Sequence, residues 1–193
     1  PGQSRNSKWL SSVVTIGNLD GVHLGHRALL ARCKKLAGKY EAVSVVTFEP
    51  LPQAVFKPEA APARLTTVYQ KLEQLRAAGA DRTWMLRFDA ALAALPPGEF
   101  VTRVLVAGLR ARCVVVGEDF RFGHRREGDV ARLKTLGEEF GFEVDTLPAV
   151  YLGAERISSS AIRNALAGGN LELAARMLGR PFRMEGHVVL GQQ

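Results

Sequence analysis

The sequence predicts an α/β fold in which an open parallel sheet has helices on both of its faces. Five short segments are rich in β-branched and aromatic residues, and they cover residues 13–17, 42–48, 82–88, 113–117 and 142–147. Most of them are almost continuously apolar, as expected of strands that are covered on both faces. The segments between them repeat apolar residues every three or four positions, which is typical of helices. Such alternation indicates a parallel sheet with right-handed crossovers.

The helical patterns follow the strands in order. They cover residues 26–38, 67–79, 98–109 and 127–141, and two shorter segments follow at 157–169 and 170–182. Several of them end at a glycine that can cap the C-terminus of a helix. Two long loops, 49–66 and 117–129, come directly after predicted strands. Ligands bind at the carboxyl ends of strands in open α/β sheets, so these loops are expected near a site.

The composition is that of an ordinary soluble protein, with 47% hydrophobic and 23% charged residues in a chain of 193. No apolar run approaches the roughly 20 residues of a membrane span, and the opening PGQSRNSKWLSS has no apolar stretch of the signal-peptide kind. We therefore expect a cytoplasmic protein. Cys33 and Cys113 have no partner cysteine at metal or redox spacing, which indicates small core residues.

The net charge of +7 comes from 26 Lys and Arg against 19 Asp and Glu. This excess raises the local concentration of anions such as nucleotides, phosphorylated metabolites or nucleic acid. The sign of the charge does not choose among them.

The stretch GNLDGVHLGH carries the first candidate site. Gly17 ends a strand, while Gly21 and Gly25 let the backbone approach a ligand closely. The residues that follow form a convincing helix, and a helix N-terminus at the mouth of a parallel sheet binds anions. His23 and His26, one turn apart, would donate hydrogen bonds to phosphate oxygens.

Neither common phosphate fingerprint is present: G-x-G-x-x-G is absent here, and so is G-x-x-x-x-G-K-[ST]. The histidine pair would take the cationic role of the missing lysine. Two other interpretations stay open, namely a metal-binding pair and a capping or core pair. No Cys or carboxylate stands at ligand spacing on the same helix, so we expect no metal ligands there.

A second candidate site is RISSSAIRNAL, where Ser158 or Ser159 is a natural N-cap and Arg163 follows about one turn later. Free backbone N–H groups, hydroxyls and a guanidinium group would form a second phosphate clamp. The alternative is an ordinary serine-capped helix with a solvated arginine.

The third candidate is GEDFRFGHRREGD, in which Phe120 and Phe122 alternate with Asp119 and Arg121. The two rings would share one face of the loop. They could stack on a planar ring system, or they could only pin the loop to the core. The basic run at 124–126 lacks the wider alternation with aromatic residues that binding of a nucleic-acid strand uses, so we expect it to be solvated.

These motifs together resemble the FAD synthetase (FMN adenylyltransferase) module of the bacterial bifunctional riboflavin kinase/FAD synthetases. GNLDGVHLGH resembles the family's GNFDGVHxGH, a version of the HxGH signature of nucleotidyltransferases. The resemblance runs from about residue 10 to about residue 183, through VVTFEPLPQAVF, RLTTVYQKLEQLRAAGAD, RFDAALAALPPGEFV, VVVGEDFRFGHRREGD and ISSSAIR. It implies a Rossmann-like fold of the HxGH type, with the adenylyltransferase domain at 1–183.

The resemblance also implies a reaction in which FMN attacks the α-phosphate of ATP, giving FAD and pyrophosphate with the help of Mg2+. The catalytic residues would be His23, His26 and Arg163. The implied ATP-binding residues are Gly17, Asn18, Asp20, Gly21, Gly25, Ser158 and Ser159. The implied flavin-binding residues are Phe48, Pro50, Asp119, Phe120, Phe122 and Gly123. Nucleotidyl transfer needs no nucleophile from the protein, so positioning and charge stabilisation suffice.

The sequence departs from the family pattern at Leu19, where Phe is usual, and at Ser160, where Thr is usual. Residues 184–193 resemble the opening of the family's riboflavin kinase barrel, and the rest of that barrel is absent. We therefore expect no phosphorylation of riboflavin by this chain.

Two alternative functions remain. One is another HxGH adenylyltransferase, acting on pantetheine phosphate or nicotinate mononucleotide, and the other is a basic nucleic-acid-binding domain. We expect partners to be small nucleotides and flavin, with no nucleic acid and no membrane.

Overall fold

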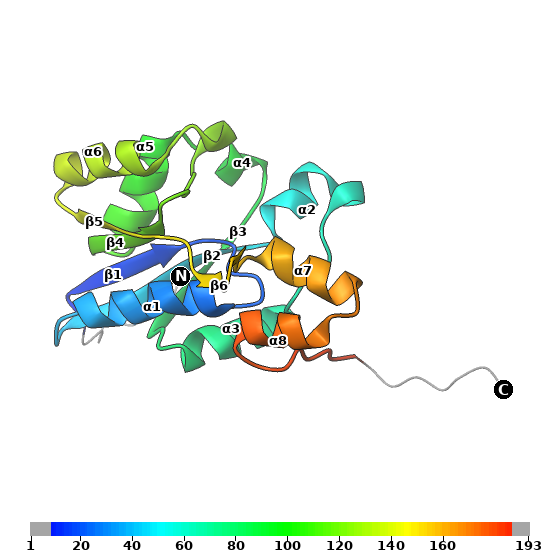
Figure 1. Cartoon of the computed structure of the whole chain (residues 1–193). Coiled ribbons are helices and arrows are strands. Elements are labelled where there is room, and N and C mark those ends of the chain that lie inside the picture. Colours follow the sequence, from blue (N-terminus) through cyan, green and yellow to red (C-terminus); the bar gives the residue numbers. More distant parts are fainter. Residues whose placement is uncertain (1–8, 187–193) are drawn as a thin grey trace.

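The computed structural model describes residues 9–186 and contains the predicted parallel sheet (Figure 1). Its strands are β1 (Ser11–Ile16), β2 (Glu41–Glu49), β3 (Arg82–Arg87), β4 (Ala111–Gly117) and β5 (Glu143–Leu147). They pair in the order β3-β2-β1-β4-β5, and every pairing is parallel. The predicted fold class and all five predicted strands are therefore confirmed.

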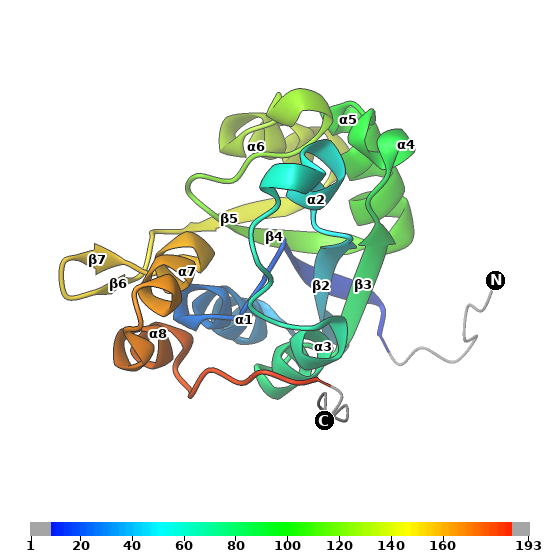
Figure 2. The ribbon, with the colours of Figure 1, turned by 90° about the vertical axis from the view of Figure 1, so that its right-hand side faces the viewer.

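Helices cover both faces of the sheet (Figures 1 and 2). One face carries α1 (Leu24–Leu36) and α3 (Val68–Ala77). The other carries α5 (Pro97–Phe100), the π-helix η2 (Val101–Gly108) and α6 (Val130–Phe140). Alternate residues of each strand supply the two cores because successive side chains point to opposite faces. In β1, Val13 packs against α1, whereas Val14 and Ile16 join the cluster below η2 and α6.

A third apolar cluster joins α7 (Ser159–Ala167) to α8 (Leu171–Leu178). Ile162 and Met177 are fully buried in it, and Leu65 and Ile157 bring in the preceding segments. These helices follow the sheet in sequence and pack beside α1 (Figure 2). The two predicted helical segments at 157–169 and 170–182 are thus confirmed. No helix within residues 9–186 combines the length and the apolar character that crossing a membrane demands.

The helix ends follow local chemistry. Thr67 and Gln70 form a reciprocal capping box at the start of α3, and Asp129 caps α6. Gly141 adopts a left-handed conformation at the end of α6, as predicted for a glycine cap, and Gly179 does the same at the end of α8. The helix predicted at 127–141 begins only at Val130, because the Asp129 cap fixes its start.

Several elements differ from the sequence-based expectation. The loop at 49–66 contains α2 (Pro52–Phe56) and the 3-10 helix η1 (Pro58–Ala60). The helix predicted at 98–109 is largely π-helical, because an apolar repeat does not distinguish an α-helix from a π-helix. Short elements also escaped the prediction: α4 (Ala90–Ala93), the 3-10 helix η3 (His124–Arg126), and the two-residue strands β6 (Tyr151–Leu152) and β7 (Glu155–Arg156).

The chain changes direction across the sheet between β1 and β4. From β1 it proceeds to β2 and β3 on one side, and then it crosses to β4 and β5 on the other side. The crossovers leaving β1 and β4 therefore diverge, which opens a crevice at the carboxyl ends of these two strands.

Candidate active site

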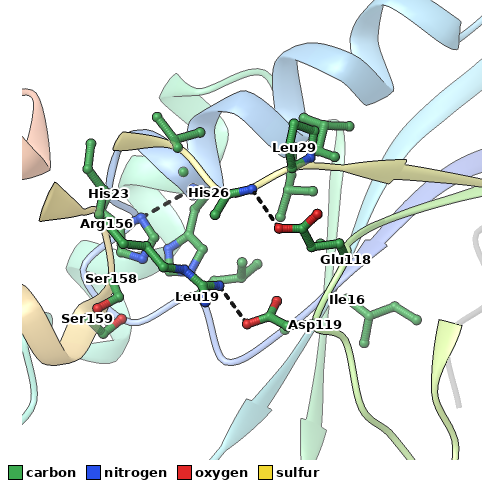
Figure 3. A pocket seen from close by; sticks show the side chains of 18 residues that line it. Ile16, Leu19, His23, His26, Leu29, Glu118, Asp119, Arg156, Ser158 and Ser159 are labelled. Atoms are coloured by element: carbon green, nitrogen blue, oxygen red, sulfur yellow. Dashed lines mark hydrogen bonds and ion pairs between the residues drawn. The ribbon is translucent and has the colours of Figure 1, made fainter. Parts of the chain in front are cut away.

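A pocket lies in this crevice, between the ends of β1 and β4 and the N-termini of α1 and α7 (Figure 3). Its lining includes Ile16, Leu19, His23, His26, Leu29, Glu118, Asp119, Arg156, Ser158 and Ser159. Gly17, Gly25 and Gly117 add backbone to its wall. The prediction that His23, His26 and Ser159 meet at the carboxyl edge of the sheet is confirmed.

The two histidines stack at the start of α1. His23 is the N-cap, and its Nδ1 accepts a hydrogen bond of 3.4 Å from the backbone N–H of His26. The ring centroids are 3.5 Å apart and the rings are nearly parallel, at 20°. A Cβ at Gly25 would lie 3.1 Å from the His23 ring, so the absence of a side chain at Gly25 makes room for this ring. The alternative interpretation of His23 as a helix cap is therefore confirmed, and the same residue also lines the pocket.

The surroundings of both histidines favour their neutral form in the free protein. Burial is the main cause: it lowers the pKa of His23 to about 4 and the pKa of His26 well below its usual value. The neighbouring charges of Arg156 and Arg180 lower the pKa of His23 further, against the opposing effect of Asp20. A neutral His23 whose Nδ1 accepts a hydrogen bond must carry its proton on Nε2. It can therefore donate one hydrogen bond to a ligand.

The N-terminus of α7 forms the opposite wall of the pocket. Ser158 is its N-cap and accepts a hydrogen bond of 3.1 Å from the backbone N–H of Ala161. The hydroxyl of Ser159 donates a hydrogen bond of 2.9 Å to the carbonyl oxygen of Asp20. This bond joins the two motifs directly, although 139 positions separate the two residues in sequence.

Asp20 is a structural anchor rather than part of the pocket wall. Its side chain is 3% exposed and accepts hydrogen bonds from the backbone N–H groups of Leu65 and Thr66 and from the Thr66 hydroxyl, at 3.0 to 3.2 Å. Arg163 completes the cluster with an ion pair of 2.6 Å to the same carboxylate. Asp20 thus ties together the histidine loop, the segment before α3, and α7.

Arg163, which the sequence placed on the ATP phosphates, is already engaged. Besides its ion pair with Asp20, its Nε donates to the carbonyl oxygen of Ala63 at 2.6 Å. The arginine on the pocket wall is Arg156 instead, whose ion pair of 2.6 Å with Asp119 is drawn in Figure 3. Sequence reasoning quoted Arg156 at the start of RISSSAIRNAL but gave it no role. Its place just before the cap of α7 was the available signal.

Three of the predicted ATP residues contribute through backbone positions. The carbonyl oxygen of Asn18 accepts from the Thr47 hydroxyl at 3.0 Å. Gly21 has φ of +82°, and a Cβ there would lie 2.9 Å from the Leu65 side chain, so both conformation and packing require glycine. Gly17 borders the pocket.

The aromatic residues expected on the flavin side lie outside this pocket. Phe48, at the end of β2, makes an edge-to-face contact with Phe88, which makes a similar contact with the exposed Phe56. Pro50, in the loop that follows, is exposed. The three rings form an aromatic group that begins at the carboxyl end of β2.

Phe120 and Phe122 do share one face, as predicted, and their rings stack with centroids 5.5 Å apart. Phe122 is only 7% exposed and also contacts Phe100, which supports the interpretation that it pins the loop to the core. Phe120 is partly exposed. Gly123 has φ of +73°, and a Cβ there would lie 2.7 Å from Pro97, so it fixes the turn of this loop.

Lys71 is a second residue of interest that sequence reasoning missed. It is fully buried on α3, with its Nζ close to the ends of β1 and β2. The signal was its place on the apolar stripe of a predicted helix, four positions before the buried Leu75.

Within residues 9–186, no group of three or more His, Cys, Asp or Glu could hold a metal ion.

A family model for FAD synthetase matches residues 5–161 of the sequence. The chain belongs to the FAD synthetase family. It is 46% identical over 182 residues to the bifunctional riboflavin kinase/FMN adenylyltransferases of Escherichia coli (strain K12) and of Pseudomonas fluorescens. In both cases the match covers 94% of this chain and 58% of the relative. This FAD synthetase chain therefore spans a little over half the length of these relatives.

The crystal structure of a macrolide-efflux protein from Streptococcus pneumoniae has a similar fold to this FAD synthetase chain, with a TM-score of 0.80 at 29% identity. The match covers 89% of this chain and 57% of that one. The fold described above thus also occurs in a solved structure.

Proposed function

We propose that this chain transfers AMP from ATP to FMN, giving FAD and pyrophosphate. The observation that carries the proposal is the meeting of the stacked histidines and the serine-capped α7 in one pocket. It occurs in a chain of the FAD synthetase family, whose relatives bear the name FMN adenylyltransferase. Two helix N-termini around one pocket favour a bound polyphosphate.

In the proposed reaction, an oxygen of the FMN phosphate attacks the α-phosphorus of ATP. The bond from that phosphorus to the bridging oxygen breaks, and pyrophosphate leaves with the electron pair. His23 and His26 would donate hydrogen bonds to phosphate oxygens on which negative charge accumulates. Because both imidazoles are neutral in the free protein, they act as oriented donors rather than as cations.

Other pocket groups would bind the ATP phosphates. Ser158 and Ser159 present the N-terminus of α7, and Arg156 supplies a cation that can exchange its partner Asp119 for a phosphate. Arg163 would act through Asp20 by holding α7 against the histidine loop. Catalysis would then consist of positioning and charge stabilisation.

The flavin is proposed to bind on the aromatic side, along Phe48 and Pro50 and the loop that contains Phe120 and Gly123. Phe120 is the ring of that loop with exposed surface, whereas Phe122 would support it from the core. Asp119 lies between the pocket and this loop. Mg2+ would arrive with the ATP phosphates and neutralise part of their charge, near the exposed carboxylates Glu118 and Asp119.

We also propose that residues 184–193 begin a riboflavin kinase domain of the kind named in the relatives. Residues 187–193 lie outside the part of the chain that the structure describes.

Incubation of the chain with ATP, Mg2+ and FMN, followed by chromatographic separation of flavins, tests the proposed function. We expect FAD and pyrophosphate in equal amounts, and no adenylated product when riboflavin replaces FMN, because riboflavin has no attacking phosphate. Parallel reactions contain pantetheine phosphate or nicotinate mononucleotide. A product from one of these, without FAD from FMN, would contradict the proposal. Salt-sensitive binding of RNA or DNA without any adenylyl transfer would favour the nucleic-acid alternative.

A further inference from the structure

Lys71 lies on α3 directly beneath the ends of β1 and β2, with no exposed surface. Its Nζ is 3.4 Å from the carbonyl oxygens of Asn18 and Phe48 and 3.5 Å from the Thr47 hydroxyl. The nearest carboxylate, on Glu49, is 3.9 Å away. One amino group therefore contacts both the segment that follows β1 and the last residues of β2.

The surroundings of this amino group favour its charged form only weakly. Its contacts are oxygen atoms that can accept hydrogen bonds, as an ammonium group requires. All of these contacts are long, however, and burial lowers the pKa of Lys71 more than the Glu49 charge raises it. Buried ions are often replaced by apolar residues of similar volume without loss of stability. Fold stability alone therefore does not explain why a lysine occupies this position.

The two segments that Lys71 joins lead to different parts of the proposed site. Asn18 belongs to the loop that ends in His23 and His26, whereas Phe48 opens the segment proposed to bind flavin. Arg64 donates two hydrogen bonds of 2.6 and 2.7 Å to the Glu49 carboxylate. The end of β2 is therefore anchored by Arg64 as well as by Lys71. Lys71 also lies near enough to His26 that its charge helps to lower the pKa of that ring.

We propose that Lys71 is a positioning residue for adenylyl transfer. Its ammonium group holds the end of β1 against the end of β2 and so sets the spacing between the histidine pair and the flavin side. This inference rests on the proposed function and deepens it. Because Lys71 has no exposed surface, it would not contact bound substrates, and its loss should lower the rate of the bound complex more than the binding of either substrate.

The test compares Lys71→Met with the wild type and with Lys35→Met, which makes the same chemical change at an exposed position of α1. Methionine fills the space but cannot bind the two carbonyl oxygens. We expect Lys71→Met to melt at the same or a higher temperature, while kcat for FAD formation falls at least tenfold and the KM values for ATP and FMN change less than threefold. Lys35→Met should match the wild type.

A second variant, Lys71→Gln, restores an amide that can donate to both carbonyl oxygens, and it should recover part of the lost kcat. A further readout does not depend on activity: NMR titration of the His26 ring should show a higher pKa in Lys71→Met and no change in Lys35→Met. The pKa should rise because removal of a nearby positive charge makes protonation of the ring easier.

The outcomes separate the two proposals. No FAD from the wild-type chain would overturn the proposed function and this inference with it. FAD formation by the wild type, with kcat of Lys71→Met within twofold of it, would overturn only the positioning role. Failure of both Lys71 variants to fold would also overturn it, because the ammonium group would then be needed for the fold itself.

Discussion

The two ends of the sheet differ in how completely their polar side chains are paired. At the amino end, Glu41 opens β2 and accepts hydrogen bonds from Arg112, from the Ser11 hydroxyl at 2.9 Å and from the backbone of Gly38 at 2.8 Å. Arg112 also reaches the carbonyl oxygen of Leu36 at 2.9 Å. These contacts connect β1, β2, β4 and α1, so the amino end is a closed network of paired charges.

At the carboxyl end, polar groups are buried with incomplete partners. Among the described residues, Nδ1 of His26 and Oγ1 of Thr15 are buried without a hydrogen-bond partner, and Lys71 has only long contacts. The backbone is also unusual there, since Leu19 and Val22 have φ of 50° and 40°. Residues other than glycine rarely adopt such angles, and functional sites are among the places where they occur.

The comparison indicates what each end contributes. Paired charges at the amino end stabilise the fold and satisfy one another's hydrogen bonds. Neutral donors, strained backbone and a nearby buried cation at the carboxyl end cost stability but keep hydrogen-bonding capacity for phosphates. Paired charges also occur at the functional end: Asp20 is bound by Arg163, Glu49 by Arg64 and Asp119 by Arg156.

The largest effect should follow from Asp20→Ala. This change leaves the Arg163 guanidinium and the backbone N–H groups of Leu65 and Thr66 without their shared acceptor. Loss of one partner of a buried ion pair costs on the order of 4 kcal/mol. We expect urea denaturation to show a loss of about that size in the free energy of unfolding, with Asp20→Asn losing less. A loss below ~1 kcal/mol for Asp20→Ala would show that the cluster is not an anchor.

The next effect concerns turnover. Replacement of His26, and likewise of His23, by Ala should lower kcat for FAD formation about 100-fold, because one donor to the developing charge contributes on the order of 3 kcal/mol. ATP affinity measured by calorimetry should change far less. An increase of KM alone would contradict the assignment of the histidines to the transition state.

The pH dependence of stability should reveal the neutral state of His23. Its pKa is about 4 when folded and 6.5 in the unfolded reference, so the unfolded chain binds the extra proton between these values. The stabilisation is complete above pH 6.5 and is lost as the pH falls toward 4. At pH 5 this loss amounts to about 2 kcal/mol.

His23→Asn keeps a side chain that can cap α1 but removes the titration. Urea denaturation at pH 7 and pH 5 should therefore show a smaller drop for this variant than for the wild type. Equal drops in both proteins would mean that His23 is not held neutral.

The fold could be predicted from the sequence because its signals are local and repeated. Apolar runs and three-to-four spacing indicated all five strands and the main helices, and turn chemistry indicated the glycine caps. The same local rules predicted that the histidine motif and the serine motif each follow the end of a strand. From this placement we predicted that His23, His26 and Ser159 lie close together. The π-helix η2 escaped because its apolar spacing resembles that of an α-helix.

The partners of the site residues could not be predicted, because they depend on contacts between distant segments. Nothing near Arg163 in the sequence shows that Asp20, 143 positions away, binds it. The ion pair of Arg156 with Asp119 spans 37 positions and is equally invisible. The protonation state of the histidines follows from burial, which a motif does not encode. Residue types were therefore predictable, whereas their roles required the structure.

The smallest effect should come from Glu41→Gln at the amino end of the sheet. Hydrogen bonds from Arg112 are the main reason why the pKa of Glu41 is lowered to about 2. The stabilisation is present above pH 4.5 and is lost as the pH falls toward 2. Arg112 is 40% exposed, so water screens the pair and we expect a loss of only about 1 kcal/mol at pH 7. Urea denaturation should show this loss at pH 7 and a smaller difference from the wild type at pH 3.

Turnover of the Glu41→Gln variant should not change, because the network lies at the opposite end of the strands from the pocket. A change in kcat of more than twofold would mean that the paired end also controls the geometry of the functional end.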